Sequence, residues 1–288
     1  MRRRNSYVAA ISLLVFSFGV LYWPVLVKLV HDWATDDNYS HGFFIVPLAA
    51  FFAWEQRKAL ADLPRRPSWM GVPVIVGSIG VLLAGLLGAE LFLSRISIVG
   101  VVAGAILFLL GWRHLQRLAF PLAFLLLMIP IPAIIFNRIA FPLQLLASQA
   151  GEVVLQAFHI PVLREGNVMT LANTSLEVAE ACSGIRSLVS LLTLGIVYGY
   201  FFDRRNLFRV LLAATTIPVA IFTNALRVAG TGIAAHYYGA SAAEGFFHEF
   251  SGLIVFAAAL ALLALVAKLA QLVWPQSSRG AEPASVPI

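Results

Sequence analysis

The chain has 288 residues, of which 60% are hydrophobic and 12% are charged, and its mean hydropathy is +0.87. Soluble domains carry roughly 25% charged residues, so this composition excludes a soluble globular protein and indicates an integral membrane protein. The formal net charge is +6, but the basic residues stand in short clusters between apolar runs. That placement indicates membrane topology and argues against a nucleic-acid surface.

Long apolar segments recur along the whole chain without alternating polarity. A hydrocarbon core about 30 Å thick takes roughly 20 helical residues, and in lipid only helices or closed barrels satisfy their own backbone polar groups. We therefore predict an all-α polytopic membrane protein with about eight transmembrane helices, the second short and the seventh interrupted by Pro218. The predicted spans cover residues 7–29, 41–54, 72–91, 96–111, 118–136, 184–202, 208–234 and 250–270.

The loops predict the orientation of the chain, because lysine and arginine concentrate on the cytoplasmic side. Fourteen of the twenty basic residues fall on the side of the N-terminus, whereas the other side holds ten of the fourteen acidic residues. Both termini are therefore expected in the cytoplasm. We expect a single membrane domain over residues 1–275 and a disordered cytoplasmic tail over residues 276–288.

The longest interruption between spans, residues 137–183, is consequently expected outside the cytoplasm. Its first part has apolar residues at mostly helical spacing among Gln144, Gln149 and Glu152, which is typical of a helix lying at the membrane interface. Its second part alternates partly between polar and apolar residues around the turn formers Gly166 and Asn167, which predicts a small β-hairpin.

Cys182 is the only cysteine and lies where this polar stretch becomes apolar. A single cysteine cannot form an intrachain disulfide, so Cys182 is a small buried hydrophobe, half of an intermolecular bridge or a reactive thiol. Taken alone, it favours the packing interpretation. The predicted topology places it at the outer membrane surface.

Two further polar groups are predicted at the same depth and face. Asn224 and Arg227 stand at spacing i, i+3 in the seventh span, and a charge within a span costs about 2.5 to 3.5 kcal/mol, so it indicates function by default. The alternative is an arginine that reaches the outer head groups. His248 stands at the start of the last span, with Gly252 one turn later, and the alternative there is a histidine on a wet interfacial loop.

The convergence of Cys182, Arg227 and His248 from three spans predicts acyl transfer by a thiol. The cysteine would attack as a thiolate, the arginine would stabilise the oxyanion, and the histidine would act as general acid and base. Gly184 would allow close approach of a substrate, or tight helix packing. Arg186 would support the thiolate, which we prefer, or contact a lipid phosphate. The other histidines show no spacing typical of a metal site, so we expect no metal and no cofactor.

Four segments resemble the exosortases, bacterial relatives of the archaeosortases. They are WATDDNYSHGFFIVP at 33–47, AEACSGIRS at 179–187, TNALRV at 223–228 and FHEFSG at 247–252. The resemblance implies a triad of Cys182, Arg227 and His248. In the YSHG segment, Tyr39 or His41 is expected to line a substrate groove, or Ser40 to cap the following helix.

The resemblance also implies a membrane cysteine transpeptidase in the inner membrane of a bacterium, with its active site on the periplasmic face. Its substrates would be proteins that end in a Pro-Glu-Pro type motif, a transmembrane helix and a basic cytoplasmic end. The acyl group would pass to an acceptor that the sequence does not identify, or to water, and exopolysaccharide production would be the context. The alternatives are a membrane transporter with Arg227 in its path, or a non-catalytic scaffold of exopolysaccharide export.

Overall fold

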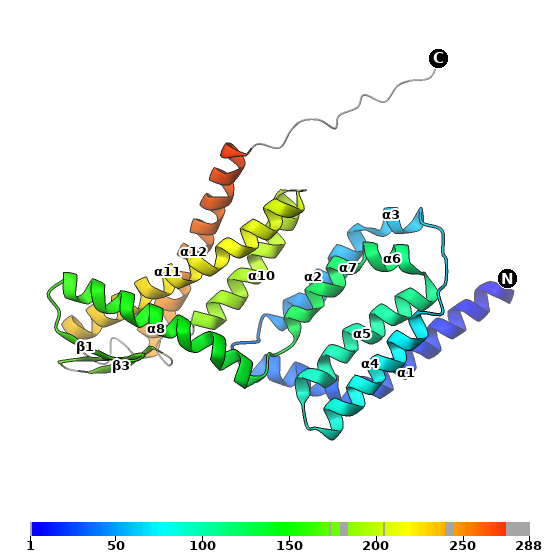
Figure 1. Ribbon diagram of the computed structural model, residues 1–288, viewed down its shortest axis with the longest axis horizontal. Coiled ribbons are helices and arrows are strands. Elements are labelled where there is room, and N and C mark those ends of the chain that lie inside the picture. The colour runs from blue at the N-terminus through cyan, green and yellow to red at the C-terminus, as the bar shows by residue number, and fades with distance from the viewer. Residues whose placement is uncertain (1, 173, 179–183, 204, 240–244, 275–288) are drawn as a thin grey trace, which may run out of the picture. The chain divides into compact units, whose positions relative to one another are not determined.

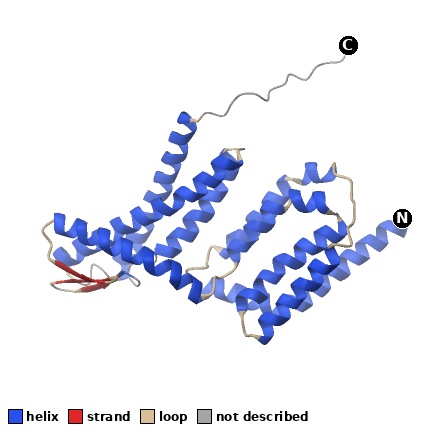
Figure 2. Ribbon diagram, in the orientation of Figure 1, coloured by secondary structure: helices blue, strands red, loops and turns tan. Residues whose placement is uncertain are grey.

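A computed structural model describes residues 2–172, 174–178, 184–203, 205–239 and 245–274 of the protein (Figures 1 and 2). The described chain is mostly helical and holds one small antiparallel sheet. It divides into two compact units, an N-terminal unit of residues 1–133 and a C-terminal unit of residues 134–288. The single domain over 1–275 stays a prediction, and the tail over 276–288 lies outside the described residues.

The N-terminal unit is entirely helical in its described part. Close packing joins α4 to α5, because a Cβ atom built on Gly71 would lie 2.4 Å from the backbone nitrogen of Phe108. Aromatic rings join α2 to α7, where Phe52 packs edge-on against Phe120 and Phe124. Its elements are α1 (Arg2–Thr35), α2 (Gly42–Glu55), α3 (Arg57–Ala61), α4 (Gly71–Leu87), α5 (Leu91–Leu109), α6 (Trp112–Arg117), α7 (Ala119–Leu125) and the 3-10 helix η1 (Leu126–Met128).

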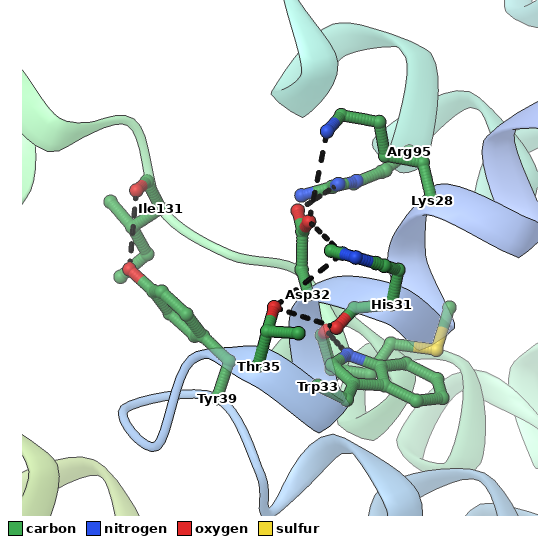
Figure 3. Close-up of polar contacts among 9 residues, drawn as sticks. Lys28, His31, Asp32, Trp33, Thr35, Tyr39, Arg95 and Ile131 are labelled. Atoms are coloured by element: carbon green, nitrogen blue, oxygen red, sulfur yellow. Dashed lines mark hydrogen bonds and ion pairs between the residues drawn. The ribbon is translucent and has the colours of Figure 1, made fainter.

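Polar side chains join α1 to α5 in the N-terminal unit (Figure 3). Arg95 of α5 is only 2% exposed, and its guanidinium donates to the carboxylate of Asp32 near the end of α1. The amino group of Lys28 lies 3.9 Å from the same carboxylate, and Nδ1 of His31 lies 3.8 Å from it. A buried arginine in an apolar helix is thus held by a carboxylate from another helix.

The C-terminal unit combines helices with the sheet. Its elements are α8 (Ala133–Ala157), β1 (Val162–Glu165), β2 (Val168–Leu171), β3 (Ser175–Glu177), α10 (Gly184–Phe202), α11 (Asn206–Tyr238) and α12 (Gly245–Val273). The strands pair antiparallel in the order β1-β2-β3, with Leu163 opposite Thr170 and Met169 opposite Leu176. The sequence predicts a hairpin in this stretch, and the structure holds three strands.

Two apolar clusters form the core of the C-terminal unit. The first cluster packs the sheet against α8 and α11, and Figure 1 shows the sheet beside these two helices. The second cluster packs α10, α11 and α12 together. The buried members of the first are Ala147, Leu155, Ile160, Met169, Leu171, Leu176, Val178 and Val228. The buried members of the second are Leu191, Phe208, Leu212, Val219, Ala220, Ala259, Leu263 and Ala267.

Each predicted span coincides with apolar helical structure, but the helices differ in length. Four described helices are long and apolar enough to cross a membrane, over residues 12–35, 91–109, 206–238 and 252–273, and a fifth span results if residues 119–157 are counted as one broken span. The helices over 42–55, 71–87 and 188–202 are apolar but shorter. The chain is thus a multi-pass membrane protein, and the count of eight spans stays a prediction.

The predicted span over 118–136 is wrong as a continuous helix. The helical chain ends at Met128, and α8 begins at Ala133. Between them stand Pro130 and Pro132, which lack a backbone N–H and disfavour the helical conformation at the residue before each of them. Two prolines at this spacing account for the break between the two helices.

Candidate active site

Helix α11 carries the two polar residues that the sequence places on one face. Asn224 and Arg227 are both 8% exposed, so they are buried within the C-terminal unit. They line a small cavity together with residues from α10, α11 and α12, which are Leu191, Ala220, Thr223, Val255, Phe256 and Ala259. The side chains around the guanidinium are therefore mostly apolar, and an anion beside it would be screened little by water.

Gly252 fixes how closely α12 approaches this arginine. A Cβ atom built on Gly252 would lie 3.1 Å from Nη2 of Arg227 and 3.4 Å from its Cζ. The guanidinium thus lies directly against the backbone of α12. His248 lies in the same helix, one turn before Gly252, and its side chain is outside the described part of the structure.

The sheet brings the chain before Cys182 to the same region of α11. The N–H of Val178 donates to the carbonyl of Asn167 at 2.9 Å, and the Val178 side chain is 1% exposed. Val178 belongs to the same buried cluster as Val228, the residue that follows Arg227. After Cys182 the chain enters α10, which begins at Gly184 and contributes Leu191 to the cavity.

The structure therefore brings Asn224 and Arg227 to one cavity. Of the chain that flanks Cys182, Val178 lies in the buried cluster that contains Val228, and Leu191 lines the cavity. Cys182 itself lies outside the described residues, as does the side chain of Arg186. The closeness of the thiol, the guanidinium and the imidazole stays a prediction. Among the described residues, no three His, Asp or Glu side chains are arranged to hold a metal ion.

Two residues that line the cavity are not predicted from the sequence. Thr223 lines the cavity while its hydroxyl donates to the Val219 carbonyl at 2.9 Å, and Phe256 forms part of the wall. Phe256 follows Gly252 by four residues, so helical spacing places it on the same face. No spacing in the sequence indicates the contact between Gly252 and Arg227, because this contact depends on how α11 and α12 approach each other.

The YSHG segment lies in the N-terminal unit and ties the turn before α2 to the chain after α7. The Tyr39 hydroxyl donates to the Ile131 carbonyl at 3.3 Å (Figure 3), and Nε2 of His41 lies 3.1 Å from the Leu127 carbonyl. Burial, and then the nearby Asp36 carboxylate, raise the pKa of Tyr39, so its hydroxyl keeps the proton that it donates. A groove lined by either side chain stays a prediction.

The expectation that Ser40 caps α2 is wrong. The residue before the helix is His41, which has a helical conformation and makes no capping hydrogen bond with its side chain. The chain already turns over residues 36–41, and the Ser40 hydroxyl donates to the Asp37 carbonyl at 3.1 Å instead. The first N–H groups of α2 already donate to backbone carbonyls, Gly42 to Tyr39, Phe43 to Ser40 and Phe44 to His41.

Comparison with protein families gives one match. The family described as Transmembrane exosortase (Exosortase_EpsH) matches residues 33–265. Neither the curated proteins nor the solved structures give a match. The matched range is most of the chain and includes the cavity on α11 together with Cys182 and His248.

Proposed function

This chain belongs to the transmembrane exosortase family, and we propose that it is a membrane cysteine transpeptidase with Cys182 as its nucleophile. The observation that carries the proposal is the buried Arg227, which lies in a cavity between α10, α11 and α12 and against the backbone at Gly252. A charged residue within a membrane helix is costly and indicates a functional site by default. Leu191 of α10, which follows Cys182, lines the same cavity, and Val178, which precedes it, shares a buried cluster with Val228.

Chain length supports a short distance between the thiol and the arginine. Cys182 follows Val178 by four residues, so the chain between them spans at most about 14 Å. Val178 and Val228 share one buried cluster, and α10 begins two residues after the cysteine. Val178 on one side of the cysteine and α10 on the other both pack on α11, which supports the proposed closeness of Cys182 and Arg227.

The proposed reaction uses each of the three groups once per half-reaction. The Cys182 thiolate attacks the carbonyl carbon of the scissile peptide bond, and the oxyanion of the tetrahedral intermediate is stabilised by the Arg227 guanidinium. His248 gives a proton to the departing amine as the C–N bond breaks and a thioester forms. His248 then takes a proton from the acceptor, which attacks the thioester and releases the thiolate.

Asn224, Gly184 and Arg186 have supporting roles in this proposal. Asn224 lines the cavity beside Arg227 and can hold the guanidinium or the substrate backbone by a hydrogen bond. Gly184 begins α10 two residues after the cysteine and would let a substrate approach the backbone closely. Arg186 stands one helical turn after Cys182 and favours its thiolate form.

The substrates that we propose are proteins with a C-terminal Pro-Glu-Pro type motif, a single transmembrane helix and a basic cytoplasmic end. Such a protein would diffuse laterally in the bacterial inner membrane and present its motif on the periplasmic face, with both termini of this chain in the cytoplasm. The acceptor would be an amine, a glycolipid or water. A role linked to exopolysaccharide belongs to the same proposal.

An in-cell processing assay tests this function. A tagged membrane protein with a Pro-Glu-Pro motif, one helix and a basic tail is expressed with the wild type or with Cys182→Ala, Arg227→Ala or His248→Ala. The matched control is Arg57→Ala, which removes an arginine that lies on the exposed ring of Trp54 in the N-terminal unit. All variants are compared at equal membrane abundance.

We expect the wild type and Arg57→Ala to shorten the substrate, and the three site variants to lose at least about a hundredfold in processing. Processing that survives Cys182→Ala would contradict the proposed chemistry. It would favour a transporter or a scaffold, in which this thiol has no role.

A further inference from the structure

The outer edge of β3 presents backbone groups in a defined pattern. The Leu171 N–H donates to the Thr174 carbonyl at 2.8 Å, and the Val178 N–H donates to the Asn167 carbonyl at 2.9 Å. In an antiparallel pair the hydrogen-bonded residues alternate, so in this register Leu176 directs its backbone groups toward Met169 of β2. The N–H and C=O groups of the residues on either side of Leu176 therefore point away from β2.

These residues are Ser175 and Glu177, and both are exposed. β3 ends the strand order β1-β2-β3, and among the described residues no backbone hydrogen bond reaches the outward groups of Ser175 or Glu177. Leu176 is buried in the apolar cluster and fixes the strand to α8 and α11. A fixed strand with an open edge is a template for another extended chain.

The open edge is next to the proposed nucleophile along the chain. Cys182 follows Glu177 by five residues, which limits the distance between them to about 18 Å. An extended peptide advances about 3.3 Å per residue, so even the longest possible distance requires only about five to six residues of substrate. A peptide paired with β3 can therefore continue to the thiol.

We propose that β3 binds the extended segment of the substrate beside its scissile bond by strand addition, with hydrogen bonds to the outward backbone groups of Ser175 and Glu177. This inference rests on the proposed function and adds the way in which the peptide is held. Backbone pairing aligns a chain without reading its side chains, so β3 sets the position of the scissile bond, and other groups select the motif.

The short edge suits a substrate better than a second copy of this chain. A stable subunit interface buries more than about 1,000 Å², which three strand residues cannot supply. A substrate held by its own membrane helix is already at high effective concentration, so a few weak hydrogen bonds suffice to align it. The occupant is thus an extended peptide tethered to the membrane.

Proline substitution tests the backbone pairing. Glu177→Pro removes the outward N–H without removing a bond to β2, whereas Glu177→Ala removes only the side chain. The matched pair on the opposite edge is Arg164→Pro and Arg164→Ala. Arg164 stands opposite Met169, whose backbone groups point to β3, so the N–H of Arg164 also points outward. The readout is processing of the tagged Pro-Glu-Pro substrate at equal membrane abundance.

We expect Glu177→Pro to process about fivefold less substrate than Glu177→Ala, which corresponds to one lost hydrogen bond. Arg164→Pro and Arg164→Ala should not differ. Equal processing by Glu177→Pro and Glu177→Ala would overturn the inference.

Photocrosslinking gives a second measurement that needs no turnover. A photoreactive amino acid replaces Ser175, or Leu163 of β1 as the control, in the Cys182→Ala background that cannot consume the substrate. Leu163 is 62% exposed in the strand at the other edge of the same sheet. A substrate adduct from position 175 and none from position 163 supports strand addition, even if the wild type does not cut. Adducts from both positions, from neither, or with a second copy of this chain would overturn it.

Discussion

At the scale of single residues, the candidate site depends on one arginine and one glycine. Arg227 is buried, and a Cβ atom at position 252 would lie 3.1 Å from its Nη2, closer than ordinary van der Waals contact. The absence of a Cβ on α12 thus allows the guanidinium to lie where it does. An oxyanion stabiliser is useful only where its donors meet the developing charge, so displacement of a few tenths of an ångström matters.

The change Gly252→Ala should therefore reduce substrate processing by about tenfold, because the new methyl group displaces Nη2 of Arg227. The matched control is Gly230→Ala in α11, where a Cβ would meet no atom within 4 Å. The in-cell processing assay at equal membrane abundance measures both. Full activity of Gly252→Ala would show that the contact between α12 and the guanidinium is not needed.

The sequence alone identifies the polar members of the site but not this contact. Asn224 and Arg227 stand at helical spacing in an apolar stretch, which is enough to predict a shared face. Val178 and Val228 are separated by fifty residues, and nothing in their local sequence indicates that they pack together. Residues far apart in the chain meet because of how helices and strands pack, which local spacing does not encode.

At the scale of elements, the carboxylate of Asp32 compensates a buried charge between α1 and α5. Arg95 is 2% exposed, so loss of its partner would leave a guanidinium in an apolar environment. Removing one member of a buried pair costs about 3 to 5 kcal/mol, whereas a partly exposed pair contributes about 1 kcal/mol or less.

The variant Asp32→Asn should accordingly lose at least about 3 kcal/mol of stability. Glu152→Gln is the comparison, because it breaks the pair between Arg164 and Glu152, whose side chains are 27% and 24% exposed, and should change stability little. Thermal unfolding of the purified protein in detergent measures both. Equal midpoints for the two variants would contradict the importance of the buried pair.

Element boundaries show where hydropathy misleads. The stretch over 118–136 is apolar enough to read as one span, but Pro130 and Pro132 divide it. Both prolines are present in the sequence, so the break could be predicted if proline positions counted for more than the hydropathy of the stretch. The strands are visible as partial alternation, whereas the third strand follows from pairing that the alternation does not specify.

At the scale of the whole molecule, the chain crosses the membrane several times and has one proposed active site. Family membership and apolar helices show a multi-pass membrane protein. The central claim is that Cys182 faces the outside and lies beside Arg227. Because Cys182 is the only cysteine of the chain, a thiol reagent reports on that position alone.

The most direct test uses a cationic thiol reagent that cannot cross the membrane. The rate at which it modifies Cys182 in intact spheroplasts is measured as a function of pH. The proteins compared are the wild type, Arg227→Ala and Arg57→Ala. A free thiol reacts with a midpoint near pH 8.5, and a nearby guanidinium favours the thiolate. We predict modification without permeabilisation, with a midpoint about one pH unit higher in Arg227→Ala than in the wild type or Arg57→Ala. Modification that requires permeabilisation, or identical midpoints in all three proteins, would contradict a site that Cys182 and Arg227 share on the outer face.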